Sequence, residues 1–93
     1  MENEIKNGLV IDFDGTKRWY YNDVYHRFGG PAIEYRFGGK HWFQNGRQHR
    51  LDGPAYVSLY DQIKHYYVDG VFYSESEFNN HPLVLMYRFV NGK

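Results

Sequence analysis

The feature that most constrains this chain is an internal repeat with a period of 23 residues. Residues 15–37 align with residues 38–60 without a gap, and nine of the 23 aligned positions are identical. A partial third copy begins at residue 61, and Leu9 to Phe13 matches the end of a further copy that has lost its front. Degenerate end copies are typical of a capped array, because a terminal unit must face water on one side. We therefore expect stacked copies of one small unit.

Each copy has the sequence pattern of a β-hairpin. Strand-favouring aromatic residues precede the pairs Asn22-Asp23, Asn45-Gly46 and Asp69-Gly70. Asn-Gly and Asp-Gly are strong hairpin signals, because both central residues of a type I′ turn need positive φ. In the two full copies a His-Arg-x-x-Gly-Pro-Ala sequence follows, and its proline marks an edge or corner. The expected fold class is mostly all-β, a meander of short antiparallel hairpins.

The segment after the third hairpin differs from the repeats. Ser74 and Glu77 fit a capping box and predict a short helix, since Pro82 disfavours helical backbone at His81. The β-branched and aromatic residues of Leu83–Val90 favour a C-terminal strand over a second helix.

The predicted organisation is one domain over residues 1–93, because a chain of this length supports one modest core. Its parts are a degenerate cap with repeat 1 at 9–37, repeat 2 at 38–60, a partial repeat 3 at 61–73 and a helix/strand cap at 74–93.

Composition excludes several classes of protein. The chain has no cysteine, which excludes disulfides, thiolate nucleophiles and cysteine-bearing zinc sites. Its 11 basic and 11 acidic residues give zero formal net charge, so the broad attraction to nucleic acids and membrane surfaces is missing. The start of the chain has no signal-peptide pattern, and the longest apolar stretch, Leu83 to Tyr87, is too short to cross a bilayer. We expect a cytoplasmic protein without membrane contact, in the host cytosol if the protein is viral.

Aromatic residues make up 20% of the chain, and many recur at fixed positions of the hairpins. Side chains alternate across a strand, which predicts two aromatic rows on opposite faces of the sheet. One row, expected to be structural, is Trp19, Trp42 and Tyr66; the other, expected to bind a partner, is Tyr20, Phe43 and Tyr67. Alternatively, both rows only support a thin fold. Two aromatic faces and the apolar segment 83–90 also predict a homodimer.

The recurring His26-Arg27 and His49-Arg50 pairs are the candidates for chemistry. They lack the further ligands of a metal site and a nearby nucleophile, and an active site rarely needs two copies of one motif. We therefore predict no metal, no cofactor, no catalytic residue and no enzymatic activity. The structural interpretation is that these side chains donate to backbone carbonyls at the Gly-Pro-Ala corner, or pair with a carboxylate such as Asp52.

Taken together, the basic and aromatic residues predict an interface, because Tyr, Trp and Arg dominate binding energies. The predicted partner-binding residues are Tyr20, Phe43, Tyr67, Arg27, Arg47, His49 and Arg50; structural repeat positions are Trp19, Trp42, Tyr66, Gly30, Pro31, Gly53 and Pro54. A protein partner is favoured. The alternative is a nucleotide or single-stranded nucleic acid stacked on rings and arginine.

The repeat resembles MORN-type repeats, and more closely the MORN-like His-Arg-x-Asp-Gly-Pro-Ala repeats of bacteriophage and giant-virus proteins. Residues 40–55 carry the full pattern, copy 1 has Gly29 in place of the aspartate, and the resemblance covers roughly residues 9–82. It implies a virus-encoded module for binding and dimerisation. From this we derive the hypothesis of an interaction with a host protein, with inhibition of a bacterial defence or housekeeping complex.

Overall fold

The computed structural model describes residues 4–92, so the ends of the predicted domain, residues 1–3 and residue 93, lie outside the described residues. The strands are β1 (Gly8–Ile11), β2 (Lys17–Tyr21), β3 (Val24–Tyr25), β4 (Ile33–Glu34), β5 (Lys40–His41), β6 (Phe43–Gln44), β7 (Arg47–Gln48), β8 (Tyr56–Val57), β9 (Lys64–Val68) and β10 (Val71–Tyr73). A 3-10 turn, η1 (Leu59–Asp61), precedes β9, and two helices, α1 (Glu75–Asn79) and α2 (Pro82–Val90), end the chain.

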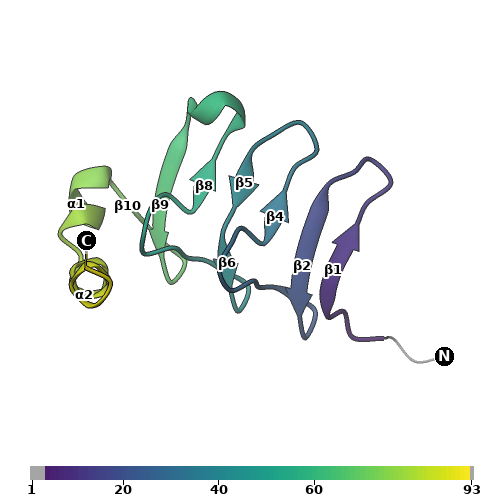
Figure 1. Cartoon of the computed structure of the whole chain (residues 1–93), viewed down its shortest axis with the longest axis horizontal. Coiled ribbons are helices and arrows are strands. Elements are labelled where there is room, and N and C mark those ends of the chain that lie inside the picture. Colours follow the sequence, from purple (N-terminus) through teal and green to yellow (C-terminus); the bar gives the residue numbers. More distant parts are fainter. Residues whose placement is uncertain (1–3, 93) are drawn as a thin grey trace.

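The strands form an antiparallel sheet in the order β1-β2-β4-β5-β8-β9-β10, with β3 paired to β2. Strands β6 and β7 form a separate hairpin. Successive strands lie along the longest axis of a body measuring 48 × 29 × 23 Å, with β1 at one end and both helices at the other (Figure 1). The prediction of a mostly β, antiparallel fold is confirmed.

The hairpin turns adopt the backbone that their sequences predict. Asn45 and Gly46 have φ values of 52° and 82°, and Asp69 and Gly70 have values of 53° and 85°. The first turn, Asn22-Asp23, has the same left-handed backbone without a glycine, at 50° and 70°. Asparagine and aspartate tolerate this region better than other side chains, which explains their place in all three turns.

Helix α1 begins at the predicted capping box. The Glu77 amide donates to Ser74 Oγ over 3.1 Å, and the Ser74 amide donates to Glu77 Oε1 over 2.9 Å. The helix is short, as expected, and His81 before the proline has an extended backbone with ψ of 134°.

The predicted strand over Leu83–Val90 is wrong, because these residues lie in helix α2. Pro82 stands at the start of the helix, and the Leu83 amide donates to His81 Nδ1 over 3.0 Å as a cap. Val84 is fully buried against the core, whereas Met86 is 60% exposed. Capping and one-sided packing thus outweigh the strand propensity of the β-branched and aromatic residues.

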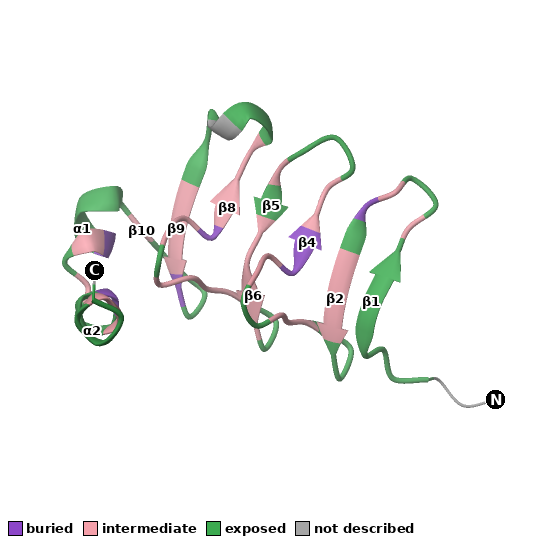
Figure 2. Cartoon of the chain, in the orientation of Figure 1, coloured by how far each residue is buried: buried purple, intermediate pink, exposed green. Residues whose placement is uncertain are grey.

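The core is small: Ala32, Ile33 and Ala55 are buried along the sheet, and, among the described residues, the one cluster of buried side chains lies at the helical end. Val68, Phe78 and Val84 are buried together, with Leu51, Tyr66 and Tyr73 packed around them. Figure 2 shows that most of the sheet is only half-buried and that β1 is exposed along its whole length. The two ends of the sheet therefore differ: helices cover one, and β1 leaves the other open.

Candidate functional site

Two tryptophan–arginine stacks define one face of the sheet. The guanidinium of Arg27 lies 3.7 Å from the Trp19 ring centre, and that of Arg50 lies 3.9 Å from the Trp42 ring centre. Such cation–π contacts stabilise by roughly 0.5–2 kcal/mol each.

Each of these arginines also binds the backbone of its own copy. Arg27 Nη1 donates to the Pro31 carbonyl over 3.1 Å, and Arg50 Nη1 donates to the Pro54 carbonyl over 3.0 Å. Glu34 pairs with Arg27 at 3.2 Å and Asp52 pairs with Arg50 at 2.8 Å. The structural interpretation of these two arginines matches the observed contacts.

The glycines of the Gly-Pro-Ala corners make room for these stacks. A Cβ atom at Gly30 would lie 3.0 Å from Arg27 Cζ, and one at Gly53 would lie 2.8 Å from Arg50 Cζ. Any larger residue would displace the guanidinium. The alanines that follow, Ala32 and Ala55, are fully buried.

The histidines act differently from the prediction, which had them donating to carbonyls or pairing with carboxylates. His26 Nδ1 accepts a hydrogen bond from the Asn45 amide, and His49 Nδ1 accepts one from the Asp69 amide, both at 2.9 Å. Each histidine thus holds the hairpin turn of the following copy. The reason is that these turn amides need an acceptor and the neighbouring copy places an imidazole beside them. Burial lowers the pKa of His49, against the opposing effect of Asp69, and so favours the neutral acceptor.

A hollow of about 440 Å³ lies between the first two copies on this face. Three of the predicted partner-binding residues, Arg27, His49 and Arg50, line it together with Trp42 and with Tyr87 from α2. A second hollow of about 300 Å³ shares Trp42 and reaches toward Lys40 and Tyr60. We call the surface formed by these two hollows the tryptophan face.

The other three predicted aromatic residues, Tyr20, Phe43 and Tyr67, lie apart from these arginines in a ladder of stacked rings. Neighbouring centroids are 4.5–5.6 Å apart along the series Tyr20, Tyr25, Phe43, His41, Tyr56, His65, Phe72 and Tyr67. Burial, and next the charge of His65, lower the pKa of His41 within it. The stacked rings stabilise the sheet, and because seven of them are half-buried and Phe72 is 56% exposed, the ladder also leaves aromatic surface in contact with solvent.

Arg47 joins neither group. It lies on β7 beside the hairpin turn, is largely exposed, and has its Nη1 atom 3.7 Å from Asp69 Oδ1. The predicted partner-binding residues therefore divide between the tryptophan face, the ring ladder and a hairpin end.

Sequence reasoning missed a row of exposed rings at the tips of three turns. Phe13 is 96% exposed, Phe37 75% and Tyr60 81%, and they lie in the β1–β2, β4–β5 and β8–β9 connections along one edge of the molecule (Figure 1). The signal was present, because an aromatic residue stands just before or within each of these turns. We call Phe13, Phe37 and Tyr60, with the lysines described next, the turn ridge.

Lys17, Lys40 and Lys64 lie at the turn-side ends of β2, β5 and β9 and are all exposed. The strand registers align them on one face, because Glu34 lies opposite both Lys17 and Lys40 and Val57 lies opposite both Lys40 and Lys64. Among the side chains that the structure describes, none of these lysines forms a salt bridge.

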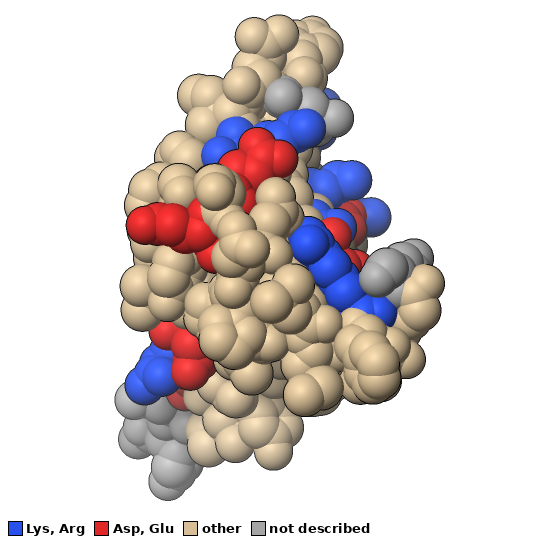
Figure 3. All heavy atoms as spheres, turned by 90° about the vertical axis from the view of Figure 1, so that its left-hand side faces the viewer, with Lys and Arg blue, Asp and Glu red and all other residues tan. Residues whose placement is uncertain are grey.

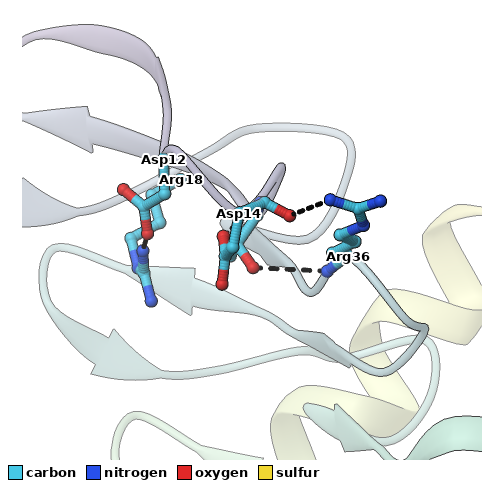
Figure 4. Close-up of polar contacts among 5 residues, drawn as sticks. Asp12, Asp14, Arg18 and Arg36 are labelled. Carbon is cyan, nitrogen blue, oxygen red and sulfur yellow. Dashed lines mark hydrogen bonds and ion pairs between the residues drawn. The ribbon is translucent and has the colours of Figure 1, made fainter.

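Figure 4 shows the polar contacts of the first turn, in which the Asp14 carboxylate accepts a hydrogen bond from the Thr16 amide over 2.9 Å. Asp12 forms an ion pair with Arg18, and Arg36 Nη1 donates to the Asp14 carbonyl over 3.1 Å. Arg36 also lies 5.1 Å from the Phe37 ring centre. The turn ridge therefore carries three exposed lysines beside its rings, with Glu34 opposite Lys17 and Lys40 in the strand register.

No group of three or more described acidic or histidine side chains is placed to hold a metal ion, and no helix in the described part of the chain is long and apolar enough to cross a membrane. No protein-family model, curated protein or solved structure matches the chain.

Proposed function

We propose that this chain is a small non-catalytic binding protein that acts by protein–protein interaction through its turn ridge. The observation that carries the proposal is the row of three largely solvent-exposed aromatic rings at successive turn tips. Rings held this far into solvent contribute little to folding, whereas exposed aromatic residues dominate binding energies at interfaces.

The spacing and charge of the ridge define the partner's chemistry. Successive tips are two strands apart, which corresponds to roughly 10 Å in a sheet. The fitting partner surface offers apolar recesses at this interval, flanked by carboxylates that face Lys17, Lys40 and Lys64.

The class of protein is part of the proposal. Equivalent contacts occur in the first two copies: the Trp19 amide donates to the Ala32 carbonyl over 2.8 Å, and the Trp42 amide to the Ala55 carbonyl over 2.7 Å. This recurrence supports a MORN-like array of hairpins with a period of 23 residues. The resemblance to phage and giant-virus repeats supports a host protein, such as a component of bacterial defence, as the target.

The nucleotide alternative has weaker support. Base stacking on Trp19 or Trp42 would need an open ring face, and a guanidinium already lies over each ring. Glu34 and Asp52 also compensate the two arginines that would meet a phosphate.

The test compares capture of host proteins by four tagged chains: the wild type, a ridge variant, a control variant and a lysine variant. The ridge variant carries Phe13→Ser, Phe37→Ser and Tyr60→Ser; the control carries Leu85→Ser, Met86→Ser and Phe89→Ser on the exposed side of α2. We expect a bacterial protein that the wild type and the control enrich and the ridge variant loses. The binding should weaken in a Lys17→Glu, Lys40→Glu, Lys64→Glu chain. The proposal fails if no protein is enriched, or if the ridge variant retains it.

A further inference from the structure

The outer edge of β1 is an unpaired strand edge without the usual protection. β1 is the terminal strand of the sheet in the described part of the chain (Figure 1). Its sequence, Gly-Leu-Val-Ile, has no proline and no charge, although proteins generally blunt exposed edges with such residues. Leu9, Val10 and Ile11 are 46%, 38% and 56% exposed.

The hydrogen-bonding groups of this edge point outward in alternation. The Asp12 amide donates to the Thr16 carbonyl over 2.8 Å, and the register pairs Val10 with Arg18 and Gly8 with Tyr20. Because peptide groups alternate along a strand, those of Leu9 and Ile11 point away from β2. They offer two donors and two acceptors to a further strand.

The opposite end of the sheet is built differently. There, β10 pairs with the second half of β9, and Phe78 of α1 lies 4.8 Å from the Tyr66 ring centre and is 1% exposed. Homodimers most often join identical surfaces about a two-fold axis, and the β1 edge can pair in this way with the same edge of a second copy.

The β1 edge is complementary to itself in that arrangement. With Val10 on the axis, Leu9 of each copy lies opposite Ile11 of the other. Apolar residues thus meet in the centre of the pair. Gly8 faces Asp12, so no like charges oppose each other in the pair.

We propose that this protein forms a two-fold homodimer by antiparallel pairing of β1 with β1 of a second copy, which joins the two sheets into one. The sequence predicted a homodimer through the aromatic faces and residues 83–90; the proposal places the interface on β1 instead. It does not depend on the partner of the turn ridge. Four-residue strands form few hydrogen bonds, so we expect the dimer to dissociate on dilution.

The first test uses the absence of cysteine in the chain, which makes an introduced thiol unique. A non-hydrogen-bonded antiparallel pair has Cα atoms about 4.5 Å apart, within disulfide range. Mild oxidation should convert most of a Val10→Cys variant to a covalent dimer. A Phe89→Cys variant, which places the thiol on α2 where the Phe89 side chain is 84% exposed, should yield little covalent dimer. Equal yields from the two variants, or no dimer from Val10→Cys, would overturn the proposal.

The second test measures mass in solution by light scattering over a concentration series. The wild type should rise toward twice the monomer mass. An Ile11→Lys variant should stay monomeric with an unchanged circular dichroism spectrum, and a Phe89→Lys variant should dimerise like the wild type. A wild type that stays monomeric at its highest attainable concentration contradicts the proposal, as does a dimeric Ile11→Lys chain.

Discussion

The two ends of the sheet differ in how their terminal strands are covered. At the C-terminal end, α1 places Phe78 over Tyr66, and Phe78 is 1% exposed. At the N-terminal end, β1 keeps both of its faces and its outer edge in contact with solvent, and Phe13 beside it is 96% exposed. The surface of the helical end is mostly uncharged, with acidic and basic side chains interspersed (Figure 3). One end is closed by the chain itself, and the other is left in contact with solvent.

This difference separates residues that stabilise the fold from residues that are available for binding. The buried core of Val68, Phe78 and Val84 lies wholly at the closed end. The unpaired edge and the first tip of the turn ridge lie at the open end. Mutations at the closed end should therefore change stability, and mutations at the open end should change association.

The largest effect is expected from Phe78→Ala. Removing a buried aromatic ring costs about 3–5 kcal/mol of unfolding free energy, through lost burial and the cavity left behind. Phe13→Ala at the open end should change stability by less than about 0.5 kcal/mol. Urea unfolding of both variants measures the comparison. Similar losses at the two sites would mean that the ends do not differ as described.

A smaller effect is expected from Ser74→Ala, which removes the side-chain acceptor at the start of α1. Loss of such a cap costs about 1 kcal/mol. Ser76→Ala, two residues further along the chain, is the matched control because the Ser76 side chain takes no part in the capping hydrogen bonds, and it should leave stability unchanged or slightly raised. Thermal unfolding distinguishes them. If both substitutions have the same effect, the cap does not hold the closed end.

The smallest effect concerns pH and the His49 contact next to the closed end. Burial lowers the pKa of His49 in the folded chain, so the unfolded chain binds this proton first as the pH falls. The neutral acceptor stabilises the fold above about pH 6.5, the ordinary histidine value, and this contribution declines as the pH drops through the lower folded pKa.

The measurement compares the wild type with His49→Gln between neutral and mildly acidic pH. The variant should lose part, and only part, of the decline in unfolding free energy, because burial also lowers the pKa of His41. Titration of the His49 ring protons by NMR should give a midpoint below that of an unfolded-chain histidine. A midpoint at or above that value would contradict the proposed acceptor role.

Local signals in the sequence predicted local structure well. The Asn-Gly and Asp-Gly pairs predicted left-handed turn residues, and Ser74 with Glu77 predicted the capping box. Both depend on a few neighbouring residues and on steric rules that hold in any context. Leu83–Val90 was misassigned because its helix depends on what Val84 packs against, which the propensities of single residues do not contain.

The candidate site shows the same limit. Alternation placed Trp42 and Phe43 in different environments, and the structure puts Trp42 under a guanidinium and Phe43 in the ring ladder. Which side chains would be covered could not be read from alternation, because Arg27 and Arg50 come from the chain segment after each hairpin. The exposure of Phe37 and Tyr60 depends on the path of the turns, and so only the structure revealed the turn ridge.

The ring of Phe78 over Tyr66 takes the place that Arg50 holds over Trp42 and Arg27 holds over Trp19. The face of this aromatic ring can thus pack against either of two groups. Where it packs against a guanidinium, another hairpin follows in the chain; where it packs against a benzyl ring on a helix, the series of hairpins ends. The length of such a protein is then set by which of the two follows a hairpin. Each additional 23-residue unit would lengthen the body by roughly 10 Å and add one tip to the row, with both ends unaltered. The number of hairpin units would then set the span of the proposed binding surface.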